Sequence, residues 1–82
     1  MVRVVFTPSF KKRFSKIKDR ALRERVVKQL EKLRDNPELG KPMRNTRKGT
    51  REVYVPPFRL SYKFINEESK VVILDLYHKD EQ

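Results

Sequence analysis

Apolar residues recur along the chain with two different spacings, and the change between them predicts the order of helices and strands. In the first half they stand three or four residues apart, which is typical of amphipathic helices. Thr7-Pro8 favours the start of one helix and Asp19 the start of a second, while Asn36-Pro37 would end the second. The apolar stripes are Phe10, Phe14 and Ile17, then Leu22, Val26, Val27, Leu30 and Leu33.

Strand patterns flank these helices on both sides. Residues 2–6 are apolar and β-branched, and residues 51–55, 59–65 and 71–77 follow the helices. In the segment 59–65 apolar and polar residues alternate, with Leu60, Tyr62 and Phe64 on one face and Arg59, Ser61 and Lys63 on the other. Pro56-Pro57 and Asn66 to Ser69 separate the strands as turns. The last strand is apolar on both sides, so we expect a central position for it.

The elements follow the order β-α-α-β-β-β and predict one α+β domain spanning residues 1–82. In this arrangement a helical hairpin packs on one face of a mostly antiparallel sheet, and Tyr62 belongs to the core. Residues 37–50 read as a loop with a short strand near Met43. No apolar run approaches the roughly 20 residues of a membrane span, and the start does not resemble a signal peptide. We therefore expect a soluble, cytoplasmic protein.

The positive charge of the chain indicates a protein that binds polyanions. The chain has 21 Lys and Arg against 11 Asp and Glu, a formal net charge of +10. Such a balance is typical of nucleic-acid binding proteins, with an acidic protein partner as the alternative. The excess is concentrated in residues 11–34 and in the acid-free segment 41–51.

The inventory of reactive side chains narrows the chemistry. One histidine and no cysteine argue against a zinc site, and no nucleotide-binding glycine motif is present, so no metal or cofactor is expected. Metal-free RNA cleavage needs less, because the RNA supplies its own 2′-hydroxyl nucleophile. Arg59 is the candidate for the phosphate charge and His78 for acid or base. Glu52, Tyr77 and Asp80 are secondary candidates.

A structural reading competes with each of these roles. His78 near the chain end is more often a solvated side chain than a catalyst, and Arg59 fits an ordinary basic surface. Tyr54 and Tyr77 suit base stacking as well as cross-strand packing. Strict alternation also places His78 with Val72, Leu74 and Leu76, and Tyr77 on the opposite face. If the last strand stays regular through His78, chemistry on the Arg59 face depends on Arg59, Tyr77 and their neighbours.

The chain resembles the RelE/ParE superfamily of toxins from type II toxin–antitoxin systems in element order and in three segments. Phe58-Arg59-Leu60-Ser61-Tyr62-Lys63-Phe64 is similar to the aromatic-Arg-Leu-x-Tyr strand of the RelE branch. Gly40-Lys41-Pro42-Met43, Gly49 and residues 51–55 look like the family's middle segment. Leu76-Tyr77-His78-Lys79-Asp80 resembles the ending of RNase branches such as YoeB and YafQ.

The resemblance implies a ribosome-dependent, metal-free endoribonuclease that cuts mRNA through 2′-hydroxyl attack, with an antitoxin protein of the RelB kind as partner. Arg59 would then stabilise the phosphorane and His78 would transfer protons. Glu52 lies where some members keep a lysine and others an acid. The residues implied to hold ribosomal or messenger RNA are Arg44, Arg47, Lys48, Arg51, Tyr54 and Lys79.

Two other functions remain open at this point. A ParE-like toxin would inhibit DNA gyrase by binding and would need no nuclease site. A non-catalytic, basic RNA-binding module would keep the charge without the chemistry. The strand from Phe58 to Phe64 and the Tyr77-His78 ending favour the RNase branch, with expected loss of cleavage in both Arg59→Ala and His78→Ala.

Overall fold

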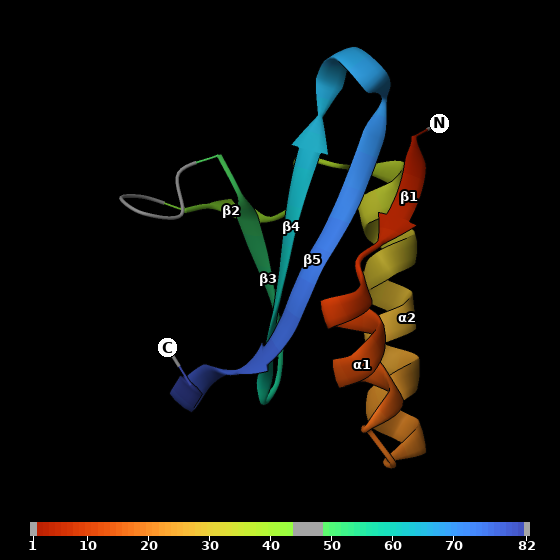
Figure 1. Cartoon of the computed structure of the whole chain (residues 1–82), viewed down its shortest axis with the longest axis vertical. Coiled ribbons are helices and arrows are strands. Elements are labelled where there is room, and N and C mark those ends of the chain that lie inside the picture. Colours follow the sequence, from red (N-terminus) through yellow and green to blue (C-terminus); the bar gives the residue numbers. More distant parts are fainter. Residues whose placement is uncertain (1, 44–48, 82) are drawn as a thin grey trace.

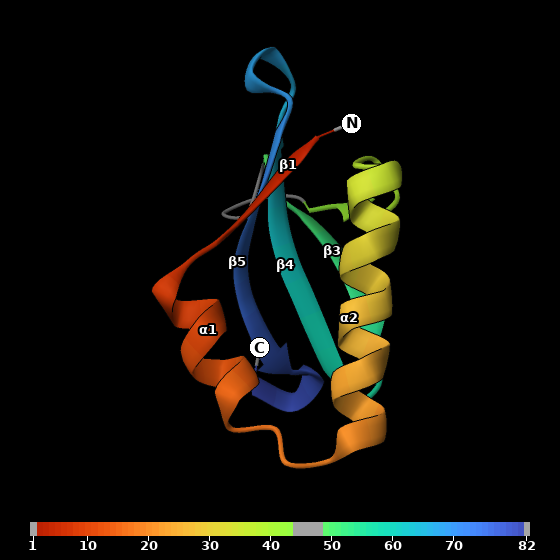
Figure 2. The same cartoon turned by 90° about the vertical axis from the view of Figure 1, so that its right-hand side faces the viewer.

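A computed structural model describes residues 2–43 and 49–81 and shows two helices on one side of a five-stranded sheet (Figures 1 and 2). The element order confirms the predicted α+β fold. The strands are β1 (Arg3–Phe6), β2 (Lys41–Pro42), β3 (Arg51–Val55), β4 (Phe58–Ile65) and β5 (Lys70–His78). The helices are α1 (Pro8–Ser15) and α2 (Arg20–Asp35), with single 3₁₀ turns η2 (Asn66–Glu68) and η3 (Lys79–Glu81).

The sheet has the strand order β1-β5-β4-β3-β2. Only the β1–β5 pair is parallel, and the other three pairs are antiparallel. The predicted central position of the last strand is confirmed, because β5 has β1 on one side and β4 on the other. This placement surrounds β4 and β5 with strands and leaves β3 near an edge.

Side-chain caps fix both helix starts where the sequence predicts them. Thr7 Oγ1 accepts a hydrogen bond from the Phe10 amide at 3.2 Å and donates to the Leu74 carbonyl at 2.7 Å. One oxygen of Asp19 accepts from the amide of Leu22 at 3.3 Å and from that of Ala21 at 2.9 Å. These bonds satisfy amides that a helix start leaves without partners, and Thr7 also ties α1 to β5.

The core lies between the helices and one face of the sheet. The predicted inward residues Leu60 and Tyr62 of β4 are completely buried. Tyr62 also holds the loop after α2, because its hydroxyl accepts from the Gly40 amide at 2.8 Å and donates to the Pro37 carbonyl at 2.7 Å. The buried core comprises Phe10, Ile17, Leu22, Val26, Leu33, Val55, Leu60, Tyr62, Val71, Ile73 and Leu76.

A bulge in β5 makes the predicted alternation wrong for its first half. The pairing passes from Tyr62–Ile73 directly to Ser61–Asp75, so Leu74 is the extra residue. Before the bulge the buried residues that face the helices are Val71 and Ile73, and after it this position falls to Leu76, with the partly exposed His78 next on the same side at the rim. The strand stays regular from Asp75 to His78, so Tyr77 and His78 face opposite sides.

The helices cover the same face of the sheet, as predicted for the helical hairpin, but they stand apart from each other (Figure 2). No helix within the described residues is both long and apolar enough to cross a membrane. Within the described part of the chain, no helix or second sheet covers the face of the sheet opposite the helices (Figure 1). We call this uncovered side the open face.

Candidate functional site

Three side chains form a row across the open face of the sheet. Arg59 of β4 pairs in register with Tyr54 of β3 on one side and with Tyr77 of β5 on the other. Glu52 precedes Tyr54 by two residues and therefore faces the same way. The two-residue turn at Pro56-Pro57 creates the Tyr54–Arg59 pairing, since Val55 and Phe58 are the first partners beyond it.

Glu52 is a buried carboxylate beside this row, with only 5% of the residue exposed. One carboxylate oxygen, Oε2, accepts a hydrogen bond from the Tyr77 hydroxyl. The other, Oε1, lies 3.7 Å from Nη1 of Arg59. A buried charge is tolerated when it is paired and hydrogen-bonded, so Glu52 joins Arg59 and Tyr77 into one cluster.

Arg59 keeps part of its hydrogen-bonding capacity available. Its side chain is 38% exposed, and its guanidinium carbon lies 5.7 Å from the ring centre of Tyr54. Its Nε is buried and makes no hydrogen bond to any described residue, so this nitrogen does not add to the exposed donors. A guanidinium held by a carboxylate at one end and exposed at the other can bind an oxyanion in a planar fork.

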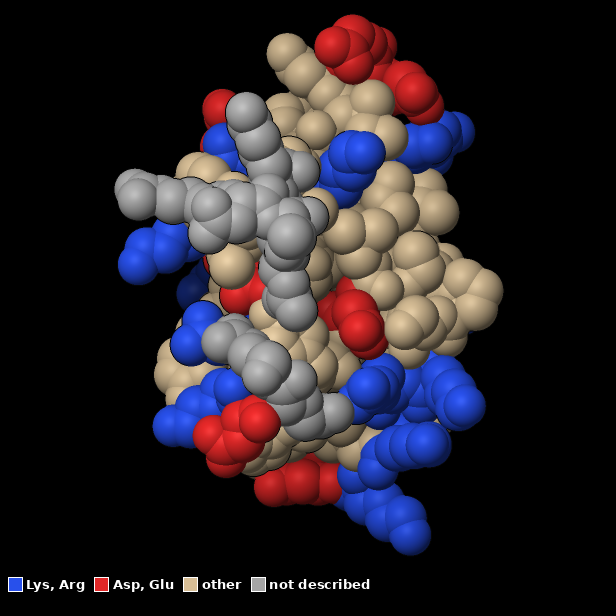
Figure 3. All heavy atoms as spheres, turned by 60° about the vertical axis from the view of Figure 1, so that its left-hand side comes forward, with Lys and Arg blue, Asp and Glu red and all other residues tan. Residues whose placement is uncertain are grey.

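Lys and Arg side chains gather in the lower half of the view in Figure 3, mostly at its lower right. The first 18 residues of the chain are strongly basic, because they contain six Lys or Arg and no acid. The acidic Asp75 pairs in register with Ser61, and its Oδ1 accepts from the Ser9 hydroxyl at 3.2 Å. With its net charge of +10, the protein surface is suited to a polyanion.

His78 and Asp80 lie away from the Arg59 row. His78 pairs with Phe58 in register, and the two rings meet edge to face with centres 5.8 Å apart. The Asp80 amide donates to Nδ1 of His78 at 3.2 Å, and Oδ2 of Asp80 lies 3.5 Å from the same nitrogen. The structure thus brings Glu52, Arg59 and Tyr77 together and places His78 and Asp80 in a separate group at the strand end.

The predicted RNA-binding residues have different surroundings. Arg51 donates through Nη1 to the carbonyls of Gly40, at 2.8 Å, and Glu38, at 3.2 Å, so it holds the loop before β2. Tyr54 is 48% exposed beside Arg59, and Lys79 is exposed in η3. Three predicted RNA contacts lie outside the described residues: Arg44, Arg47 and Lys48.

Comparison with known protein families identifies the family of this chain. A family model described as the ParE toxin of type II toxin–antitoxin systems, parDE, matches residues 4–82. The chain belongs to the ParE toxin family. The sequence-based prediction of a RelE/ParE superfamily toxin is therefore confirmed. A search of curated protein sequences finds no significant match.

Solved toxin structures share the fold of this ParE-family chain. The toxin–antitoxin complex RelBE2 from Mycobacterium tuberculosis matches at 30% identity and TM-score 0.82, covering 95% of this chain and 98% of that one. The archaeal RelE–RelB complex from Pyrococcus horikoshii matches at 17% identity and TM-score 0.81, covering 99% and 98%. The YoeB/ParE toxin from Agrobacterium tumefaciens matches at 13% identity and TM-score 0.83, covering 94% and 98%.

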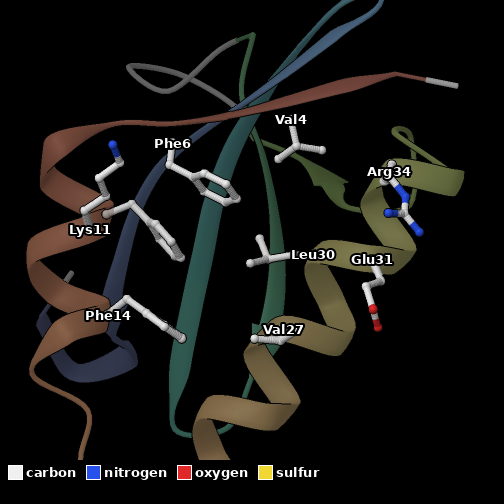
Figure 4. Close-up of a pocket in the computed structure, with 9 residues that line it drawn as sticks. Val4, Phe6, Lys11, Phe14, Val27, Leu30, Glu31 and Arg34 are labelled. Carbon is white, nitrogen blue, oxygen red and sulfur yellow. The ribbon is translucent and has the colours of Figure 1, made fainter.

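A second surface of this ParE-family domain lies on the other side of the sheet. Here α1, β1 and α2 enclose an apolar groove of about 500 Å³ (Figure 4). The rings of Phe6, Phe10 and Phe14 stack along one wall, with successive centres 5.5 and 5.6 Å apart. The groove is lined by Val4, Phe6, Phe10, Lys11, Phe14, Val27, Leu30, Glu31 and Arg34.

Two neighbours of the Arg59 cluster were not among the predicted site residues. Ser61 is 8% exposed and lies between Glu52 and Asp75 in the strand register. Lys41 of β2 pairs with Glu52 on its other side. The Pro56-Pro57 turn could have identified Ser61, because counting outward from it pairs Ser61 with Glu52. Lys41 carried no such signal, since the pairing of β2 is only two residues long.

Proposed function

We propose that this ParE-family toxin is a ribosome-dependent endoribonuclease that cleaves mRNA through its own 2′-hydroxyl groups. The observation that carries the proposal is the partly exposed Arg59 side chain beside the hydrogen-bonded Glu52–Tyr77 pair. A cation for the phosphate and a proton acceptor are thus adjacent on the open face. RNA cleavage by transesterification needs these two functions and a proton for the leaving group.

In the proposed reaction the 2′-oxygen attacks the adjacent phosphorus and the bond to the 5′-oxygen breaks. Arg59 stabilises the added negative charge on the non-bridging oxygens. The 2′-proton passes to Tyr77 as the Tyr77 hydroxyl gives its proton to Glu52, so the pair acts as the base. The products are a 2′,3′-cyclic phosphate and a 5′-hydroxyl.

The 5′-oxygen must receive a proton as it leaves. His78, at the end of β5, and solvent water are the two candidate donors. His78 faces the side opposite Tyr77, so it reaches the leaving group only around the end of the strand. A His78→Ala variant decides between them: a loss similar to that of Arg59→Ala assigns the proton to His78, and near-complete activity assigns it to water.

Primer extension on programmed ribosomes tests the proposal. Arg59→Ala should lower A-site cleavage by about 10²–10³-fold, the size found when one oxyanion-stabilising donor is removed. Lys63→Ala is the matched control, because Lys63 is an exposed cation on the same strand and the same face. Intact mRNA with the wild-type protein would contradict the proposal, and inhibition of gyrase supercoiling in the same preparation would support the alternative function.

We infer that an antitoxin binds the apolar groove between the helices. Related structures are toxin–antitoxin complexes, and the groove exposes apolar surface with the cations Lys11 and Arg34 at its rim. These features suit an amphipathic segment with acidic residues beside its apolar face. Since the groove and the Arg59 row lie on opposite faces of the sheet, this contact alone leaves Arg59 uncovered.

Co-expression with a RelB-like antitoxin tests the groove. Val27 is 43% exposed in the groove, so Val27→Asp should weaken the complex more than about tenfold without opening the core. Val5→Asp is the control, because Val5 is 38% exposed on β1 outside the groove lining. Equal effects of the two substitutions would contradict this binding site.

A further inference from the structure

A separate hollow lies between the outer edge of β3 and α2. These two elements run alongside each other in Figure 2. We call it the β3-edge groove. Its volume is about 360 Å³, and it meets the Arg59 cluster at Tyr54 and Glu52. Its lining residues are Gln29, Lys32, Leu39, Lys41, Glu52, Val53 and Tyr54.

The groove is open because β2 is short. Within the described residues β2 pairs only with Arg51 and Glu52, so no strand covers the outer edge of β3 beyond them. The Met43 amide donates to the Thr50 carbonyl at 2.9 Å, which directs the backbone groups of Thr50 outward. By alternation the amide and carbonyl of Tyr54 also point outward, into the groove.

The side chains around these backbone groups match the parts of a nucleotide. Tyr54 and Leu39 are 48% and 44% exposed and offer apolar surface to the faces of a base. Gln29 brings an amide that both donates and accepts. Lys32 and Lys41 are exposed cations suited to a phosphate. A peptide strand would also use the open edge, but it would not need the two lysines.

We propose that the β3-edge groove binds the nucleotide adjacent to the phosphodiester that Arg59 holds. The base stacks against Tyr54 and Leu39, its edge contacts Gln29 and the Tyr54 backbone, and Lys32 and Lys41 bind the flanking phosphate. This inference rests on the proposed RNA cleavage. The groove thereby adds specificity for the sequence beside the cut, since Arg59 itself contacts only the phosphate.

A double-mutant cycle on programmed ribosomes tests the subsite. The protein variants are Gln29→Ala and Leu39→Ser, and the mRNA variants carry one abasic nucleotide at each position flanking the cut. On intact mRNA each protein variant should slow cleavage at least about fivefold, the lower range for one base contact. When the abasic nucleotide occupies the position that binds in the groove, the variants and the wild-type protein should cleave the mRNA at the same rate. Lys41→Ala should slow cleavage of all mRNAs equally.

Lys28→Ala is the control, because Lys28 is an exposed cation of α2 that lines a different hollow. Additive effects at every position, or effects no larger than that of Lys28→Ala, would overturn the subsite. A peptide in the groove would give the same additive result together with weaker binding of the partner protein. Absence of cleavage by the wild-type chain would instead contradict the proposed function.

Discussion

Replacing Tyr77 with phenylalanine separates the chemical role of its hydroxyl from its role in the fold. Tyr77 is 6% exposed, and its hydroxyl donates to Glu52. The substitution keeps the buried ring on β5 beside Arg59. It removes only the donor to one oxygen of a buried carboxylate.

The stability cost follows from that lost donor. Leaving a buried acceptor short of a hydrogen bond costs about 1–3 kcal/mol. A domain of 82 residues has an unfolding free energy of roughly 4–12 kcal/mol, at about 0.05–0.15 kcal/mol per residue. The variant should therefore remain folded at 25 °C, and urea unfolding measures the difference directly.

The effect on activity should be much larger than the effect on stability. Loss of a proton-transfer group lowers the rate by about 10²–10⁴-fold, so single-turnover cleavage by Tyr77→Phe should fall by that amount. Glu52→Gln should fall by a similar factor, because the two groups act as one base. If Tyr77→Phe retains full activity while losing stability as calculated, its hydroxyl only supports Glu52 and the relay is refuted.

Three further outcomes follow from the structure. Burial raises the pKa of the Tyr62 phenol above its ordinary value of 10.0, so its contribution to the unfolding free energy is complete below about pH 10 and declines above it. Tyr62→Phe should lower the free energy of unfolding by about 2–4 kcal/mol, because Gly40 and Pro37 both lose a hydrogen-bond partner. Urea unfolding measured at several pH values should also show a smaller alkaline decline in this variant. Asp19→Ala should cost about 0.5–2 kcal/mol through loss of the α2 cap, whereas Asp35→Ala at the other end of that helix should not. Ribosome binding should weaken steeply with salt. The logarithm of the binding constant should fall with the logarithm of the salt concentration, with a slope of about −0.7 for each phosphate neutralised on a single strand, and salt-independent binding would contradict the electrostatic argument.

The parts of the site that depend on local rules were predictable from the sequence. The Pro56-Pro57 turn joins two alternating strands, so the face shared by Arg59 and Ser61 followed from the pattern. The apolar stripes and the caps at Thr7 and Asp19 likewise predicted both helices. These features depend on residues close in sequence, where spacing alone determines which side chains meet.

The remaining parts depend on long-range packing. The bulge at Leu74 lets both halves of β5 direct apolar residues inward, although their spacing does not alternate regularly. No local rule separates such a bulge from a strand that is apolar on both faces. The burial of Glu52 was equally inaccessible, because it requires Tyr77 and Arg59 from two other strands. The bonds from Arg51 to the backbone of Glu38 and Gly40 were inaccessible too, because these partners belong to a loop.

The alternation along β4 and β5 couples the packing of the core to the positions of the proposed catalytic residues. Leu60 directly follows Arg59, and Leu76 directly precedes Tyr77. Both leucines are completely buried on the other face of the sheet. A cavity at either leucine shifts the backbone that carries the neighbouring site residue, and shifts of about 1 Å can reduce catalysis a hundredfold. A genetic selection for cells that survive expression of the toxin would then recover two kinds of variant equally readily: folded variants with core substitutions, and variants with substitutions at Arg59. Loss of toxicity alone is therefore a poor criterion for assigning a catalytic residue in this family.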